Sequence, residues 1–411
     1  MTSLIEVLPF DIIETIVYLL AIDSASDHPS QNETLQACSL TCQTLLPLCQ
    51  KQIFCFVLIR DVESKAALVK LIQHSQHTPR FFEYVRKLDY LVEPTDWEAS
   101  GPTSIVALLK HFTKLSSFMI DFQVNWIAGC YNNWTKIPPE VRSTFLSLMT
   151  LPTITSLEIH GNLLEFDHIG LLPSTSLREL RLNCVGFADW DDSPPVNTTA
   201  KSIKLHKLDI SFDQSVEWVA TTLKPYFEDG TSTLDLRELK YLKAISCYDL
   251  SLVAEICKKT HLLETLVLTF MCHDKNMQLI TPIIAASLKT LTTLSLNFIF
   301  VCKMTNYDGV LPAIRDILQG IAGQNILSVL ELQINLFLHH TPNIDEWGIF
   351  EEILLAPGWP SLAQFDLEVT HFIDSTDDVD NRLERLHETH FGGLASSRSI
   401  AFNFNIKILI S

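Results

Sequence analysis

The sequence predicts an α/β fold in which a small helical module is followed by a long run of stacked strand–helix repeats. An apolar phrase recurs through most of the chain, the stretches between its copies have helical spacing, and the first 55 residues lack the phrase. With 411 residues, 47% of them hydrophobic, the chain can bury a sizeable core. We therefore expect a helical module over residues 1–55 and a solenoid over residues 56–411.

The recurring phrase is Leu-x-x-Leu-x-Leu, with an occasional Ile or Phe in place of a leucine. Its copies lie roughly 23 to 39 residues apart, a period typical of stacked repeats in which no single unit buries its own apolar face. Clear copies begin at Leu177, Leu205, Leu263, Leu291, Leu327 and Leu362, and looser copies surround Leu88, Phe118, Leu157, Leu242 and Ile400.

Each copy has the alternation of a short strand, so that Leu180 and Leu182 point one way and Arg181 points the other. The stretches between copies, such as residues 307–321, carry apolar residues at the spacing of one helix face. Strand, crossover helix and strand form the unit that gives a parallel sheet, with the sheet inside and the helices outside. The alternative is an ordinary α/β domain with leucine-rich strands.

Over residues 80–411 this pattern resembles the leucine-rich-repeat family in its irregular, long-repeat form. That family places an Asn or Cys a few residues after the strand, and Asn183, Cys184 and Asn297 stand at that place here. Other repeats of the chain lack this residue.

The N-terminal module contains two apolar stretches with helical spacing. Pro9 stands where a helix can begin, and an apolar stripe follows it at Ile12, Ile13, Ile16, Leu19 and Leu20. After a polar linker, a second block places Leu35, Cys38, Cys42 and Leu45 on one helix face. A third short helix is expected to reach Phe54, and residues 56–59 are expected to start the sheet.

These residues resemble the F-box family, the helical module that docks onto the Skp adaptor of cullin-based ubiquitin ligases, and above all its form in mushroom-forming fungi. Gln43 and Leu45 depart from the family, which carries Arg and Trp at those places. The alternative is a helical cap that shields the first repeat. The resemblance implies adaptor binding by Leu8, Pro9, Ile12, Ile16, Leu20, Leu35, Leu40 and Leu48.

Charge and hydropathy exclude several classes of partner. The formal net charge of -18 disfavours binding to nucleic-acid phosphates or to anionic lipid. No apolar run approaches the roughly 18 residues that span a bilayer, and Glu6, Asp11 and Glu14 are unlike a secretion signal. We therefore expect an intracellular protein, cytoplasmic or nuclear or both, whose ten cysteines are reduced.

Catalytic and metal-binding motifs are absent from the sequence, so we expect no enzyme activity and no cofactor. His387 and His390 lie three residues apart, one residue short of the zinc-protease spacing. The acidic group Asp374, Asp377, Asp378 and Asp380 lacks the glycine and terminal glutamate of a calcium-binding loop, so a solvated turn is favoured.

The strand alternation also predicts which side chains point outward, away from the core. On this face acids outnumber bases, which favours a target with a basic, partly apolar segment, although outward strand positions of a solenoid are polar in any case. The predicted target-binding residues are Asp89, Glu158, Arg181, Asp209, Lys243, Val267, Glu331 and Asp366.

The two resemblances together imply a substrate-recognition subunit of a cullin-based SCF ubiquitin ligase. The F-box would bind the Skp-type adaptor, and through it a cullin, while the repeats would bind a target protein. The alternatives are a stand-alone repeat scaffold without ligase association, or an enzyme with a nonstandard site, which would require a deep polar-lined pocket.

Residues 399–408 form the last apolar alternation of the sequence, with Ile400, Phe402, Phe404, Ile406 and Ile408 on one face. We expect this segment to complete the last repeat and to pack on a helix within residues 382–390. Its free edge would otherwise be open to a partner or to a second copy of the chain.

Overall fold

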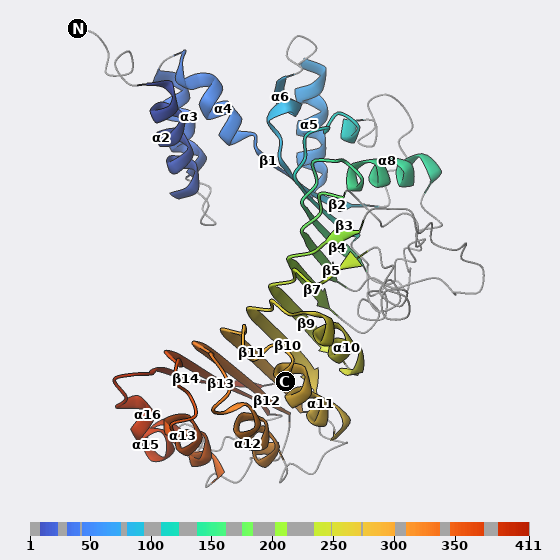
Figure 1. Cartoon of the computed structure of the whole chain (residues 1–411). Coiled ribbons are helices and arrows are strands. Elements are labelled where there is room, and N and C mark those ends of the chain that lie inside the picture. Colours follow the sequence, from blue (N-terminus) through green and yellow to red (C-terminus); the bar gives the residue numbers. More distant parts are fainter. Residues whose placement is uncertain are drawn as a thin grey trace. The chain divides into compact units, whose positions relative to one another are not determined.

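The computed structural model divides the chain into two compact units, Met1–Leu177 with Ala188–Ser193, and Arg178–Phe187 with Pro194–Ser411 (Figure 1). The sequence predicts a different division, 1–55 and 56–411, whereas the first unit combines the N-terminal helices with the first repeats. The structure describes residues 9–23, 31–41, 43–74, 80–93, 108–122, 138–161, 175–183, 202–211, 234–247, 249–272, 274–300, 310–337, 346–373 and 385–410.

The first unit begins with a helical module of α2 (Phe10–Asp23), α3 (Gln31–Thr41) and α4 (Leu45–Ile53). Its core is formed by residues that recur three or four positions apart on each helix, because that spacing repeats one face of an α-helix. These core residues are Ile13, Val17, Leu35, Leu48 and Cys49, with Leu20, Ala21, Cys38, Leu45 and Ile53 packed against them.

The repeats of the first unit contribute four strands to the parallel sheet, in the order in which they occur in the chain. These are β1 (Phe56–Ile59), β2 (Lys87–Val92), β3 (Ser117–Phe122) and β4 (Ser156–Gly161). The accompanying helices are α5 (Val62–His74), α6 (Arg80–Tyr84) and α8 (Pro139–Met149).

The second unit contributes eight strands to the parallel sheet, again in chain order. They are β5 (Glu179–Asn183), β7 (Lys207–Ser211), β9 (Tyr241–Cys247), β10 (Thr265–Met271), β11 (Thr293–Phe300), β12 (Val329–Phe337), β13 (Gln364–Ile373) and β14 (Ala401–Ile410). A separate pair is formed by β6 (Ile203–Lys204) and β8 (Leu234–Asp235). The helices are α10 (Ser251–Lys259), α11 (Asp274–Ala285), α12 (Val310–Ile321), α13 (Gly348–Leu355), α15 (Leu386–His390) and α16 (Gly392–Ala395).

The middle apolar residue of the recurring phrase forms a continuous ladder through the second unit. Successive partners across the strands are Leu180, Leu208, Leu242, Leu266, Leu294, Leu330, Phe365 and Phe402. All of these are buried except Phe402, which is half-buried. Because the register aligns every phrase with the next, apolar side chains stack on one face of the sheet and α10 to α13 lie on that side.

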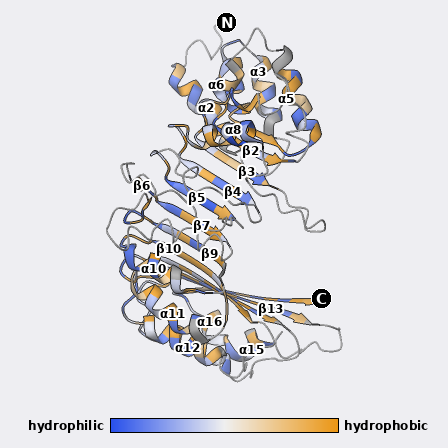
Figure 2. Cartoon of the chain, turned by 90° about the vertical axis from the view of Figure 1, so that its right-hand side faces the viewer, coloured by the Kyte–Doolittle hydropathy of each residue, from blue (hydrophilic) through white to orange (hydrophobic). Residues whose placement is uncertain are grey.

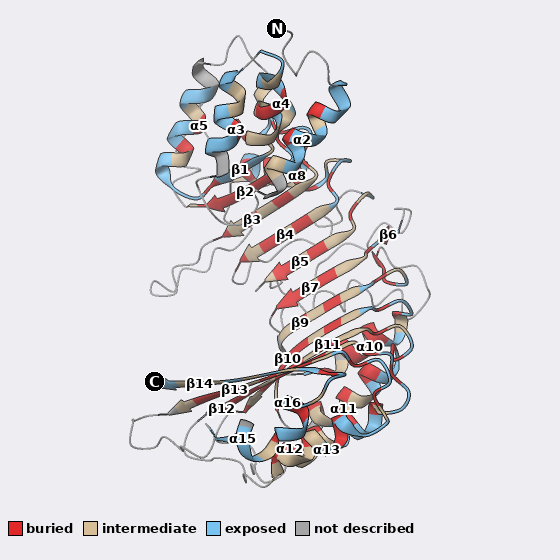
Figure 3. Cartoon of the chain, turned by 90° about the vertical axis from the view of Figure 1, so that its left-hand side faces the viewer, coloured by how far each residue is buried: buried red, intermediate tan, exposed pale blue. Residues whose placement is uncertain are grey.

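The alternation is visible along each strand. In β11, for example, every second residue from Leu294 to Phe300 is buried and the residues between are half-buried (Figure 3). The same strands alternate in hydropathy (Figure 2). The expected α/β fold with a parallel sheet, twelve strands among the described residues, is confirmed.

Serine or threonine stands two residues before the anchor of several repeats and links that repeat to the previous one. The hydroxyls of Ser116, Thr155, Thr292 and Ser328 donate to the carbonyl oxygens of Arg86, Ser116, Glu264 and Thr292, at 3.1–3.2 Å. The backbone N–H groups of the same residues donate to the same oxygens at 2.8–2.9 Å. Each such residue therefore fixes the register at the start of a strand.

Strand β14 is present as expected, but its packing is looser than the sequence suggests. All ten of its residues pair in register with β13. Phe402 and Phe404 pack on Phe391, between α15 and α16, with ring centroids 5.4 and 5.3 Å apart. However, residues 401–409 are all exposed or half-buried, so the strand completes the sheet without burying its apolar row.

Among the described residues, no helix has the length and apolar character needed to cross a bilayer.

Candidate binding surfaces

Helix α2 exposes an apolar stripe beside its buried face. Ile13 and Val17 point into the core of the module, whereas Ile12 and Ile16 are 47% and 44% exposed. Leu19 is also exposed. Because residues i, i+4 and i+7 lie above one another on a helix, Ile12, Ile16 and Leu19 form one row, which we call the α2 stripe.

Further apolar side chains of the module are open to solvent. Leu40 at the end of α3 is 86% exposed, and Phe10, Tyr18 and Leu46 are exposed as well. Exposed apolar groups that gather on one small module are costly unless they are covered by a partner. The fold of the helical module therefore leaves several of its own large apolar side chains uncovered.

The structure divides the predicted adaptor-binding residues into two groups. Pro9, Ile12, Ile16 and Leu40 are exposed, Leu20 is half-buried, and Leu8 lies outside the described residues. Leu35 and Leu48 belong to the core of the module, so their prediction as contact residues is wrong. Sequence spacing places them on an apolar face but does not say whether that face meets a partner or the neighbouring helices.

The two departures from the F-box pattern have different environments. Leu45 begins α4 and packs against the core of the module, whereas Gln43 is exposed. Leu45 thus fills part of the space inside the module with an apolar side chain. An ion pair between Lys51 Nζ and Glu14 Oε1 (2.8 Å) ties α4 to α2 at the surface, where such pairs contribute at most about 1 kcal/mol.

The outward face of the first unit contains Glu158, His160, Asp121 and Asp89. Glu158 Oε1 lies 2.7 Å from His160 Nε2, and both side chains are half-buried. Asp89 is only 5% exposed, so its prediction as a target contact is wrong. Its Oδ2 lies 3.5 Å from Lys87 Nζ, while its buried Oδ1 has no hydrogen-bond partner among the described residues.

Burial also perturbs the acids of this face. It raises the pKa of the Asp89 carboxyl above its usual value, and the neighbouring Lys87 ammonium opposes this effect. The pKa of Asp121 is raised in the same way, with His160 opposing it. These two carboxylates are therefore poorly solvated, because they gain less from their cationic neighbours than they lose by leaving water.

The remaining predicted target-binding residues form one half-buried outward row in the second unit. In strand order these are Arg181, Asp209, Lys243, Val267, Glu331 and Asp366. Lys243 Nζ lies 3.8 Å from Asp209 Oδ2. Beside this row, Lys207 Nζ lies 4.7 Å from the ring centroid of Tyr241.

A ladder of side-chain hydrogen bonds crosses β11 to β14 on the outward face. Asn297 Nδ2 donates to Gln333 Oε1 at 2.8 Å, Gln333 Nε2 donates to Glu368 Oε1 at 2.9 Å, and Lys407 Nζ donates to Glu368 Oε2 at 2.6 Å. Asn403 Nδ2 donates to Asp366 Oδ1 at 2.7 Å. The acids Asp366 and Glu368 are therefore engaged within the sheet, whereas Glu331 forms no hydrogen bond or ion pair among the described residues.

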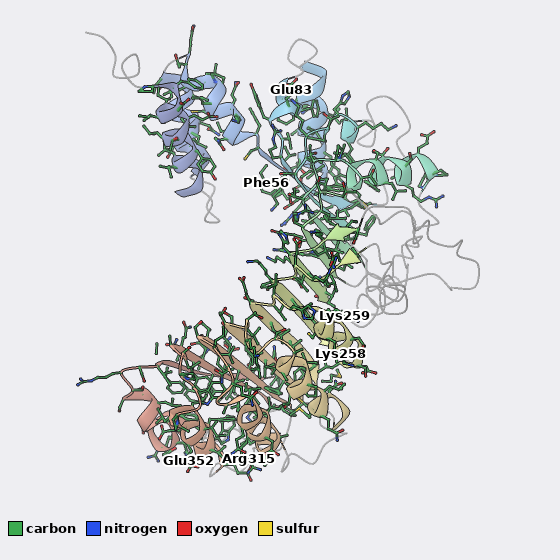
Figure 4. The ribbon with its side chains drawn as sticks, viewed as in Figure 1. Phe56, Glu83, Lys258, Lys259, Arg315 and Glu352 are labelled. Carbon is green, nitrogen blue, oxygen red and sulfur yellow. The ribbon has the colours of Figure 1, made fainter. Side chains whose placement is uncertain are left out.

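Sequence reasoning did not predict this ladder. Its signal is present, because Asn297, Gln333, Glu368 and Asn405 each stand three residues after the anchor of their repeat, on the same outward row. The helices of the second unit differ from the outward face of the sheet, since their charged side chains pair within one helix. Arg315 and Asp316 of α12, for example, lie 2.9 Å apart (Figure 4).

A cluster of side chains suited to metal binding is not assembled in the described part of the chain. Within it, no group of three or more His, Cys, Asp or Glu side chains is placed to hold a metal ion. The acidic segment that includes Asp374, Asp377, Asp378 and Asp380 lies outside the described residues. Burial raises the pKa of the Cys257 thiol to about 12, so this thiol stays protonated and unreactive at neutral pH.

No protein-family model matches the chain, and no curated protein matches it either.

Proposed function

We propose that this protein is the substrate-recognition subunit of a cullin-based SCF ubiquitin ligase. The helical module would bind a Skp-type adaptor through the α2 stripe, and the outward face of the repeats would bind a target protein. Ubiquitin transfer would be carried out by other subunits of the complex.

The observation that carries the proposal is the exposed α2 stripe. A module that served only as a cap for the repeats would need polar outer surfaces, because terminal units of solenoids face water. Here Ile12, Ile16 and Leu19 face outward while Ile13 and Val17 already supply the core. An amphipathic helix with such a second apolar row suits packing against the helices of another protein.

The outward face of the second unit supports the other half of the proposal. Its polar groups are largely bonded to one another, so the sheet presents a fixed pattern of charge and amide groups. A preorganised polar surface favours specificity, because a partner must match groups that lose little freedom on binding. Val267 and Glu331 lie on this face without such bonds among the described residues, and they suit a partly apolar, basic segment.

The proposal is tested by co-purification of the full chain with a Skp-type adaptor. Ile12→Lys places a charge on the α2 stripe and should weaken adaptor binding at least tenfold, since burying an unpaired charge at an apolar contact is costly. Tyr18→Lys is the matched control, because Tyr18 is also exposed on α2 but is not three, four or seven residues from any member of the stripe. Circular dichroism should show both variants folded.

Equal loss of binding in both variants would mean that the α2 stripe is not the contact. If the unmodified chain fails to bind any Skp-type adaptor, the ligase assignment is wrong and the stand-alone scaffold becomes the better description. Target capture by the repeats can then be measured independently of the adaptor.

A further inference from the structure

Strand β14 is the last strand in the sheet order of the second unit, and no described strand borders its other side. It is ten residues long and pairs with β13 over its whole length. The N–H of Ala401 donates to the carbonyl of Ala363 at 2.8 Å, so the odd-numbered residues of β14 direct their backbone groups toward β13. In a parallel ladder the even-numbered residues, including Ile406 and Ile408, then direct theirs to the open side.

Among the described residues, this edge lacks the features that usually prevent strand pairing between molecules. Proteins protect such edges with short strands, proline, bulges or free lysines. β14 contains no proline or glycine and no break in its register, and its single charge, Lys407, is bonded to Glu368. By contrast β1, the first strand of the sheet order, has only four residues.

We propose that the open edge of β14 pairs antiparallel with β14 of a second copy of this chain, about a two-fold axis at Asn405. A two-fold axis perpendicular to the sheet keeps the apolar rows of both copies on the same side. Phe402 then lies opposite Ile408 of the second copy, and Phe404 lies opposite Ile406 of the second copy. Pairs of an aromatic and a β-branched side chain are among the favourable cross-strand pairs.

The distribution of charge selects this register. With the axis at Asn405, Lys407 lies opposite the neutral Asn403 of the second copy, and the two Lys407 Cα atoms are about 14 Å apart at about 3.4 Å per residue. Moving the axis to Ile406 would bring the two lysines two residues closer along the strands. Pairing of β14 with the β1 of another copy would leave most of the ten-residue edge unmatched.

This inference is independent of the ligase assignment, and it is tested on the purified full chain. Light scattering coupled to size-exclusion chromatography should give the mass of a dimer that dissociates on dilution. Ile406→Lys should shift the equilibrium to the monomer by at least tenfold in dissociation constant, because it places two charges on the shared apolar row. If monomeric Ile406→Lys melts at the same temperature as the unmodified chain diluted to its monomer, the fold of the variant is intact.

Cysteine cross-linking tests the register. Asn405 of each copy would form a pair without backbone hydrogen bonds, with Cα atoms about 4.5 Å apart, which is within the range of a disulfide. Asn405→Cys should therefore give a disulfide-linked dimer under mild oxidation. Asn403→Cys is the matched control, since Asn403 is exposed on the same row but its two copies would be about 14 Å apart.

A single-chain mass at all concentrations would overturn the proposal. So would a dimer in which Asn403→Cys cross-links as readily as Asn405→Cys, or one that Ile406→Lys leaves intact. The unmodified chain, oxidised in parallel, accounts for any cross-link through the native cysteines.

Discussion

The helical module and the second unit expose opposite kinds of surface. The module leaves apolar side chains such as Ile12 and Ile16 in water beside a small core, whereas the second unit exposes polar side chains that bond to one another above a long leucine ladder. Covering the first surface lowers the free energy, because burial of apolar area drives association. Covering the second surface lowers the free energy little, and its fixed polar groups are of the kind that favours specificity over affinity.

The largest expected effects on stability come from substitutions in the two hydrophobic cores, that of the second unit and that of the helical module. Phe298 is fully buried, and its ring lies 5.2 Å from that of Phe270, so Phe298→Ala should cost about 3–5 kcal/mol of the free energy of unfolding. Ile13→Ala removes a smaller side chain from the module and should cost about 2–4 kcal/mol. Denaturant titrations followed by circular dichroism measure both values. If Phe298→Ala also abolished adaptor binding while Ile13→Ala left it unchanged, the two surfaces would not be separable as described.

A smaller effect is expected from Asp89, the buried acid on the outward face of the first unit. Its folded-state pKa is raised by burial, so the folded state holds its proton more tightly than the unfolded chain does. The carboxyl therefore opposes folding above its folded pKa, and this cost disappears as the pH falls below the unfolded value of about 3.9. Asp89→Asn should raise the melting temperature at pH 7, and the gain should shrink toward pH 4. A gain that persists unchanged in acid would contradict burial as the cause.

The smallest effect on stability is expected at Glu331, where substitution should alter binding alone. Glu331 is half-buried on the outward face of the second unit without a bonded partner among the described residues, so Glu331→Lys should change the free energy of unfolding by less than about 0.5 kcal/mol. Capture of a target protein should nevertheless be weakened. The matched control is Glu352→Lys on helix α13, an exposed residue away from the sheet face (Figure 4). Equal loss of capture in both variants would move the binding site away from the outward face.

The sequence was a good guide to the repeats because their periodicity is redundant. Each strand of the parallel sheet from β5 to β13 contains an apolar alternation, and pairing one copy with the next sets the register of all of them. Burial within the module was harder to predict, since Ile12 and Ile13 are adjacent isoleucines of which Ile12 is exposed and Ile13 is buried. Which of them faces the core depends on where α3 and α4 pack, and this is not encoded in the spacing of α2.

The outward residues show the same limit. Alternation correctly placed Asp89 away from the apolar row, yet it gives no measure of how deeply neighbouring side chains cover that position. The amide ladder from Asn297 to Glu368 depends on residues of successive repeats that are aligned only after the strands pair. Such contacts follow from the register rather than from any one repeat.

The strands of the second unit grow longer along the chain, from five residues in β5 and β7 to ten in β13 and β14. Since neighbouring repeats stabilise one another through the ladder they share, the interfaces are graded in strength. Partial unfolding of the second unit should therefore begin at β5, where the paired strands are shortest, and proceed toward β13. Amide hydrogens of β12 and β13 should exchange with solvent last, and a pulling force applied across the unit should peel off its early repeats first.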